Sequence, residues 1–100
     1  VYIIRLLMSF FVYILLCSDG SYYTGHTDNL EKRIEMHSSG EIGGYTCTRL
    51  QIKLVFSESF STREEALINE RKIKGWSRNK KKALIKGDWN EVSRLSQKKY

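Results

Sequence analysis

The sequence predicts an α+β fold, a small sandwich in which helices flank a three-stranded antiparallel sheet. Two short runs of β-branched and aromatic residues surround a glycine-containing turn, which is typical of a β-hairpin. A third run with alternating apolar residues follows one helical segment, and helical periodicity continues after it. The chain has 100 residues, which is enough for one domain with a modest core.

The first two strands are expected at residues 11–17 and 22–26. The length of the loop between them decides which side chains share a face of the sheet. With a two-residue loop, the phenols of Tyr13 and Tyr23 would point to opposite faces. With a three-residue loop that ends in a left-handed Gly20, Tyr13 lies opposite Gly25 and on the same face as Tyr23. We expect the second register, because glycine suits the third loop position and Gly25 leaves space beside the Tyr13 ring.

A first helix is expected at residues 29–38. Asp28 and Glu31 have the spacing of a capping box, and apolar residues recur at helical intervals after them. The glycine-rich segment 39–44 is expected to be a loop.

A third strand is expected at residues 51–60, where apolar and polar residues alternate. One side of this strand should carry Ile52, Leu54 and Phe56, and the other Lys53, Val55 and Ser57. The predicted order of two strands, one helix and a third strand is the order that suits a small α+β sandwich.

Three further helices are expected at residues 62–74, 77–86 and 88–95, followed by a frayed tail at 97–100. Ser61 and Glu64 repeat the capping signature at the first of them, and Gly75 should end that helix in the left-handed conformation. Gly87 should end the second helix, and Asp88 should begin the third. The expected organisation is an N-terminal extension at residues 1–8, a main domain at 9–87, and a short helix and tail at 88–100.

The net charge of +6 is unevenly distributed. Residues 71–100 carry eleven Lys or Arg against two acids, whereas residues 1–70 carry six against nine. A localised basic surface suits a polyanionic partner, although a solvated helix surface would look the same in sequence. Cys17 and Cys47 lack the spacing of a zinc or redox motif, so reduced thiols in the cytoplasm are expected.

The first seventeen residues are apolar apart from Arg5 and Ser9. This run is at the short limit for a membrane span, and the predicted first strand takes its second half. It also lacks the basic start and the small-residue cleavage site of a secretory signal. Met8 is a candidate for the native start, in which case residues 1–7 are an upstream extension; an extra strand is the alternative.

Three charged or titratable residues fall where core residues are expected. Arg33 and His37 are four residues apart beside the apolar stripe of the first helix, and Glu70 interrupts the stripe of the second. A buried carboxylate is costly unless it meets a cation or a metal. Glu70 could instead simply pair with Arg33 or with Lys74, and a histidine near a helix end is often only a favourable cap.

Four strings in the sequence resemble the GIY-YIG nuclease superfamily, in particular its small single-domain bacterial branch. They are VYILLCSDGSYYTGHTDNLEKRIEMHSSG, GGYT, KLVFSESF and TREEALINERKIKGWSRNKKKALI. The likeness runs from about residue 11 to residue 86. Val12 and Thr24 replace the Gly and Ile of the two triplets that name the superfamily. Asn79 is the candidate here for an active-site Asn that several larger relatives carry.

The resemblance implies that Tyr13, Tyr23, Arg33, His37 and Glu70 surround one Mg²⁺ or Mn²⁺ ion and cleave phosphodiester bonds. Glu70 would be the protein's metal ligand, and Arg33 would offset charge in the transition state. Tyr13 would act as general base or position the attacking water, with Tyr23 and His37 assisting. Arg33 and the metal should favour ionisation of the phenol, whose ordinary pKa is about 10.

Nucleic acid should lie along the basic segment and near the glycine-rich loop. The expected contacts are Lys72, Lys74, Arg78, Lys80, Lys81, Lys82, Tyr45 and Thr46. Trp76 is expected in the core rather than as a stacking platform, and Tyr45 and Thr46 could equally be structural anchors.

The function expected from this resemblance is a metal-dependent DNA endonuclease in repair or DNA processing. RNA as the substrate and a protein recruiter remain open, and no organic cofactor or membrane is expected. One alternative is a non-catalytic DNA- or RNA-binding module that has kept the scaffold. A further alternative is a membrane-associated protein that uses residues 1–17.

Overall fold

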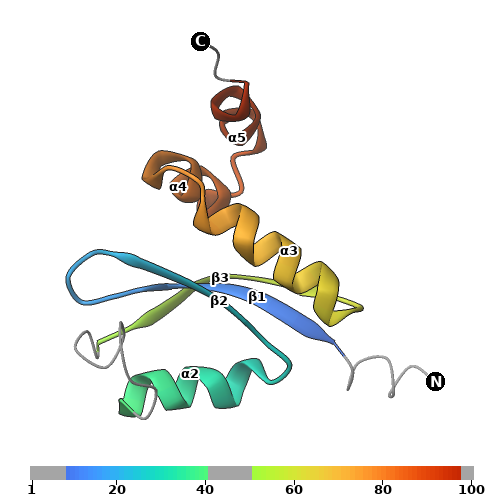
Figure 1. Ribbon diagram of the computed structural model, residues 1–100. Helices are drawn as coiled ribbons and strands as arrows, with labels where there is room; N and C mark the ends of the chain where they lie inside the picture. The colour runs from blue at the N-terminus through green and yellow to red at the C-terminus, as the bar shows by residue number, and fades with distance from the viewer. Residues whose placement is uncertain (1–8, 41–50, 98–100) are drawn as a thin grey trace.

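A computed structural model describes residues 9–40 and 51–97 of the chain. Its elements are β1 (Phe10–Leu16), β2 (Tyr22–Thr27), α2 (Leu30–Ser39), β3 (Lys53–Phe60), α3 (Arg63–Lys74), α4 (Arg78–Lys86) and α5 (Trp89–Ser96). The antiparallel sheet has the order β2-β1-β3. Figure 1 shows α2 on one face of this sheet and α3 on the other, with α4 and α5 continuing away from it. The predicted three-stranded α+β sandwich is confirmed.

The β1–β2 hairpin has the predicted three-residue loop. Tyr13 lies opposite Gly25, and Leu15 lies opposite Tyr23. The loop closes because the Gly20 N–H donates to the Cys17 carbonyl oxygen (2.8 Å). Gly20 has a φ of 85°, a left-handed conformation that costs glycine little. The two tyrosines therefore project from the same face of the sheet, as predicted.

The apolar core begins between the sheet and α3 and continues to α4 and α5. Its buried members are Val12, Ile14, Ala66, Ile73, Ala83, Leu84 and Val92. Because successive side chains of a strand alternate between faces, Val12 and Ile14 face α3 whereas Tyr13 faces α2. Full burial of a side chain such as Ile14 contributes about 1.5 to 3 kcal/mol to stability. Trp76 packs against this core, as predicted.

Strand β3 departs from the predicted alternation. Ile14 pairs with Phe56 and Leu15 pairs with Leu54, which leaves Val55 as a bulge. Val55 and Phe56 both pack against the core, whereas Leu54 is 38% exposed. The prediction that Leu54 and Phe56 lie on the same side of the strand is therefore wrong, because the extra residue reverses the alternation. The strand also begins at Lys53, two residues later than expected.

The N-caps of two helices lie one residue later in the sequence than predicted. The Asn29 side chain, not that of Asp28, accepts the Lys32 N–H (3.1 Å) and caps α2. Asp28 pairs instead with Arg63 of α3. In the same way, Thr62 rather than Ser61 caps α3. Each site has two adjacent capping residues in the sequence, so the pattern alone was off by one position.

The predicted left-handed stop at Gly75 is wrong. Gly75 has a φ of −82°, which any residue can adopt, and the chain makes a further turn there through the Trp76 N–H and the Ile73 carbonyl oxygen (3.0 Å). Gly40 and Gly87 are left-handed and end α2 and α4. Asp88 caps α5, as predicted. In residues 9–40 and 51–97, the helices are all too short or too polar to cross a bilayer.

The contrast between Gly20 and Gly75 can be tested by alanine substitution. A Cβ at either position meets no atom closer than an ordinary contact. Gly20→Ala should lower the free energy of unfolding by about 1 to 2 kcal/mol, because alanine disfavours positive φ. Gly75→Ala should leave it unchanged or raise it by up to about 1 kcal/mol, because alanine restricts the unfolded chain. Urea denaturation followed by circular dichroism measures both, and equal effects would contradict the assigned backbone conformations.

Candidate active site

Three aromatic side chains from β1, β2 and α2 meet on the α2 face of the sheet. The ring centroids are 6.3 Å apart for Tyr13 and Tyr23, 5.9 Å for Tyr13 and His37, and 5.0 Å for Tyr23 and His37. The Tyr13 hydroxyl lies 3.0 Å from His37 Nε2, and both side chains are fully buried. The hairpin register places the phenols, and the spacing along α2 turns His37 inward toward them.

Gly25 is the residue that lets Tyr13 reach this position. A Cβ at Gly25 would lie 2.6 Å from the Tyr13 hydroxyl oxygen and 2.8 Å from its Cζ. Those distances are shorter than atoms tolerate, so the phenol occupies the space that a side chain would fill. The expected space beside the Tyr13 ring is confirmed, and the phenol itself uses it.

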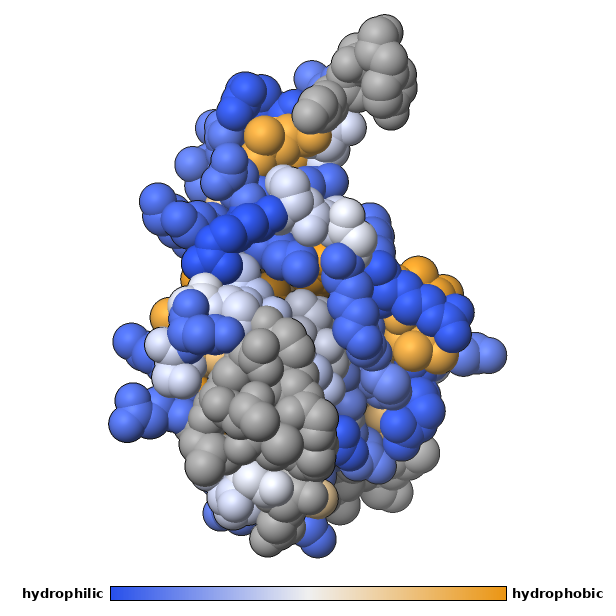
Figure 2. All heavy atoms as spheres, turned by 60° about the vertical axis from the view of Figure 1, so that its left-hand side comes forward, coloured by the Kyte–Doolittle hydropathy of each residue, from blue (hydrophilic) through white to orange (hydrophobic). Residues whose placement is uncertain are grey.

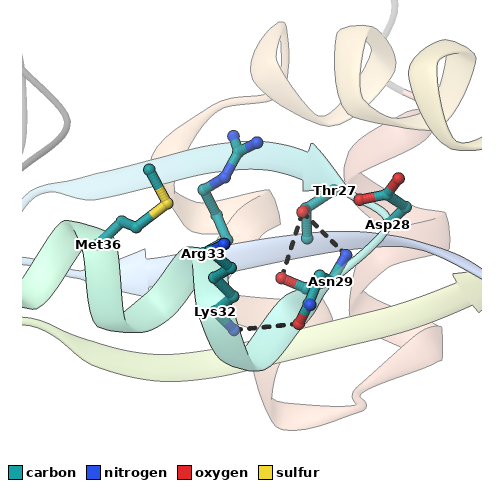
Figure 3. A pocket seen from close by; sticks show the side chains of 6 residues that line it. All are labelled: Thr27, Asp28, Asn29, Lys32, Arg33 and Met36. Carbon is teal, nitrogen blue, oxygen red and sulfur yellow. Dashed lines mark hydrogen bonds between the residues drawn. The ribbon is translucent and has the colours of Figure 1, made fainter.

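Arg33 lies one turn before His37 on α2. In Figure 3 its side chain rises from α2 across strand β2, at one wall of a pocket of about 250 Å³. The pocket is lined by Thr27, Asp28, Asn29, Lys32, Arg33 and Met36. Thr27 and Asn29 hydrogen-bond to each other and hold the chain that leads into α2. Two cations therefore line an open hollow at the start of α2.

Burial sets the protonation of the aromatic cluster. It raises the pKa of Tyr13 to about 12, and the neighbouring Tyr23 adds to the shift, whereas the Arg33 guanidinium opposes it. Burial and the charge of Arg33 lower the pKa of His37. At neutral pH the site thus holds a protonated phenol beside a neutral imidazole. Arg33 acts on the pKa of Tyr13 in the expected direction, but the effect of burial is larger.

Glu70 lies on α3, on the opposite face of the sheet from the aromatic cluster. Its side chain is 9% exposed, and both of its oxygens are engaged. Lys74 Nζ lies 2.7 Å from Oε2, and His26 Nδ1 makes a short hydrogen bond with Oε1. Burial alone would raise the pKa of Glu70, but the hydrogen bonds and charges of Lys74 and His26 lower it. Pairing with Lys74, one of the alternatives considered for Glu70, is present.

The five predicted site residues therefore form two groups at the β2 edge of the sheet. Tyr13, Tyr23, Arg33 and His37 gather on the α2 face. Glu70 belongs to the α3 face, but its charge acts across the strand and raises the pKa of the Tyr13 phenol.

His26 was missed from the sequence, although a signal was present. In the three-residue-loop register His26 pairs with Val12, and Val12 faces α3. His26 therefore had to project toward the helix that carries Glu70. The register that predicts the faces of Tyr13 and Tyr23 also predicts the face of His26, the residue after Gly25.

The donors around Glu70 fit a hydrated divalent cation. The carboxylate is ionised, and the Lys74 ammonium already shows that a cation can sit against Oε2. Within the described ranges there is no group of three or more His, Cys, Asp or Glu side chains that could enclose a metal. Mg²⁺ and Mn²⁺ accept such a site, since they bind through one or two carboxylates and keep several waters. Lys74 is 54% exposed and can move aside.

The predicted nucleic-acid contacts differ in their surroundings. Lys72 and Lys82 are exposed, whereas Lys74 pairs with Glu70. Arg78 lies over the Tyr22 ring (4.4 Å) and Lys80 lies over the Trp76 ring (4.1 Å). Partial burial, and secondly Arg78, lower the pKa of Lys81. Tyr45, Thr46 and Cys47 lie outside the described residues, and Asn79 lines a separate pocket with Lys82.

These cations belong to a surface that is broadly hydrophilic. Figure 2 shows blue side chains over much of the helical part of the molecule, interrupted by small apolar areas. Each of the two stacked pairs combines a cation with an aromatic ring, a combination that also suits contacts with bases and phosphates.

The fold and the tyrosine pair agree with the nuclease superfamily that the sequence resembles. Residues 9–83 match the family model described as the GIY-YIG catalytic domain. The chain therefore belongs to the GIY-YIG family, a superfamily of endonucleases, and its relatives place it in the small bacterial UPF0213 branch.

Those relatives are known from sequences and solved structures. UPF0213 proteins of Staphylococcus aureus, including strains Mu50 and NCTC 8325, are 46% identical over 78 residues, which cover 78% of this chain and 95% of theirs. The solution structure of the UPF0213 protein BH0048 from Bacillus halodurans is similar with 39% identity and a TM-score of 0.53, covering 91% of this chain and all of that one. The solution structure of the protein EF2693 from E. faecalis is similar with 32% identity and a TM-score of 0.54, covering 92% of this chain and 93% of that one.

The buried neutral His37 predicts a pH dependence of stability. Its pKa is lower in the folded protein than the ordinary 6.5, so the unfolded chain binds a proton that folded His37 does not. The free energy of unfolding should therefore fall as pH drops below about 6.5 toward the lowered pKa. Urea titrations at pH 7.5 and 5.5 measure this, and His37→Gln should show a weaker dependence. An unchanged dependence in that variant would assign the effect to another group.

The ion pair between Lys74 and Glu70 predicts competition with a divalent cation. Lys74→Met should tighten Mn²⁺ binding by up to about fivefold, because a partly exposed ion pair contributes at most about 1 kcal/mol. Lys72→Met is the matched control, since it removes the same charge from an exposed position two residues away. Calorimetry without nucleic acid compares the two variants. An equal gain in both would mean that only net charge matters.

Proposed function

We propose that this protein is a divalent-metal-dependent endonuclease that hydrolyses phosphodiester bonds in DNA, in repair or DNA processing. The observation that carries the proposal is the position of the Tyr13–His37 pair and Arg33 across strand β2 from a buried, ionised Glu70. A phosphodiester at this edge would meet the Arg33 guanidinium, which lies next to the buried Tyr13 phenol, and a carboxylate that can hold a cation.

Arg33 and Glu70 would have different electrostatic roles in this reaction. Arg33 reaches the open pocket at β2 and would stabilise the charge that builds up on the phosphoryl oxygens. A Mg²⁺ or Mn²⁺ ion on Glu70 would supply the polarisation of the phosphoryl group and stabilise the leaving oxygen. Glu70 can take this role because its pKa is lowered and it stays ionised at neutral pH.

Tyr13 and His37 would handle the proton of the attacking water. A pKa of about 12 makes a phenolate rare at neutral pH, so Tyr13 is better suited to a relay than to acting as a preformed base. The water would donate its proton to the Tyr13 oxygen while the phenol proton moves to His37 Nε2, 3.0 Å away. His37 can accept it because its lowered pKa keeps the imidazole neutral. Tyr23 packs against the imidazole and fixes its orientation.

The exposed cations of α3 and α4 would follow the nucleic-acid backbone. Lys72, Arg78 and Lys82 are exposed and lie within the segment of highest positive charge. Release of counterions from the phosphates would then contribute most of the affinity. These contacts do not distinguish DNA from RNA, so RNA is a second substrate class for the same site.

One observation favours a second candidate function. Both oxygens of Glu70 are already bound to side chains, which is also how a site without catalysis would satisfy a buried carboxylate. The second candidate is a DNA- or RNA-binding module that has kept the nuclease scaffold.

The two candidates are separated by a cleavage assay. Labelled single-stranded, duplex and branched DNA is incubated with or without Mg²⁺ or Mn²⁺. Glu70→Ala and Arg33→Ala should each reduce the cleavage rate by about 10² to 10³-fold, and Tyr13→Phe should also impair it. Glu64→Ala, an exposed acid on the first turn of the same helix, should cleave like wild type. Binding without cleavage, unaffected by Glu70→Ala, would favour the binding module.

A further inference from the structure

His26 is a titratable side chain that the proposed hydrolysis does not use. The chain has two histidines, and His37 belongs to the aromatic cluster on the α2 face. His26 projects from β2 toward α3, where Nδ1 contacts Glu70 Oε1. Its side chain is 26% exposed, so solvent and ions can reach it.

Charge neutralisation does not require this contact. The Lys74 ammonium already pairs with the other oxygen of Glu70. What His26 adds is a nitrogen donor facing an oxygen donor, each held by a rigid element. The His26 backbone is fixed by its pairing with Val12 in the sheet, and Glu70 lies in the third turn of α3. The two atoms are joined by a hydrogen bond in this arrangement, and a metal ion can replace a proton in that position.

We propose that His26 and Glu70 form a nitrogen–oxygen ligand pair, so that the site binds a first-row transition ion such as Mn²⁺ in preference to Mg²⁺. This inference rests on the proposed metal dependence and specifies the metal. Mg²⁺ binds oxygen ligands and gains little from an imidazole, whereas transition ions bind imidazole nitrogen readily. The ordinary alternative is that His26 only orients Glu70 through a hydrogen bond, as the partners of metal ligands commonly do.

The variant His26→Gln separates these roles. Glutamine keeps a hydrogen bond to Glu70 but offers no imidazole nitrogen, so it preserves orientation and removes the proposed ligand. His26→Phe removes both, and Glu70→Ala removes the oxygen ligand. The protein must carry no histidine tag, and no nucleic acid is present. Circular dichroism confirms that each variant is folded.

Two measurements are made on each protein. Calorimetry with Mg²⁺, Mn²⁺ and Co²⁺ gives the affinity ratios, and pulsed electron paramagnetic resonance of bound Mn²⁺ detects a coupled imidazole nitrogen. Wild type should bind Mn²⁺ at least about tenfold more tightly than Mg²⁺ and show the nitrogen coupling. His26→Gln and His26→Phe should lose both the preference and the coupling, and Glu70→Ala should weaken all three ions.

Several results would overturn the inference. These are an unchanged Mn²⁺ to Mg²⁺ ratio in His26→Gln, the absence of nitrogen coupling in wild type, and no metal binding by wild type. Different results would refute the proposed nuclease activity and the proposed ligand pair. If wild type shows the imidazole signature but cleaves no DNA, the ligand pair stands and the nuclease proposal falls. If cleavage requires Glu70 while His26→Gln keeps the metal preference, the nuclease proposal stands and the ligand pair falls.

Discussion

The register of the β1–β2 hairpin is the constraint on which the rest of the site depends. A left-handed Gly20 allows the three-residue loop, and that loop sets Tyr13 opposite Gly25. The same register directs Tyr23 toward α2 and His26 toward α3. A slip by one residue would exchange the faces of β2 and separate both pairs. The backbone conformation at one turn therefore determines which side chains of β2 face α2 and which face α3.

Much of the fold followed from local signals, and the errors have identifiable physical causes. The order of elements, the hairpin loop and the cap at Asp88 are encoded by neighbouring residues. The shift of two caps by one residue arises because Asp28-Asn29 and Ser61-Thr62 each offer two acceptors in a row. The bulge at Val55 and the right-handed Gly75 accompany the packing of Val55 and Trp76 against the core, and no short window of sequence contains those contacts.

The candidate site was predictable where it depends on alternation and not where it depends on burial. Strand parity brought Tyr13 and Tyr23 together, and helical spacing turned His37 inward. The same parity would have found His26 had it been followed one residue further. The high pKa of Tyr13 could not be anticipated, because desolvation sums over the whole surroundings and outweighs the charge of Arg33.

Strand β2 lies at the margin of the sheet, hydrogen-bonded to β1 on one side. The aromatic cluster and Glu70 sit on opposite faces of it. A strand occupies only about 5 Å of sheet width, so a ligand that crosses this edge can meet Arg33 on one face and Glu70 on the other. A compact molecule resting on either face would meet only half of them. Under the proposed function, such an edge would favour a long, thin, anionic polymer over a compact substrate, before any individual base is contacted.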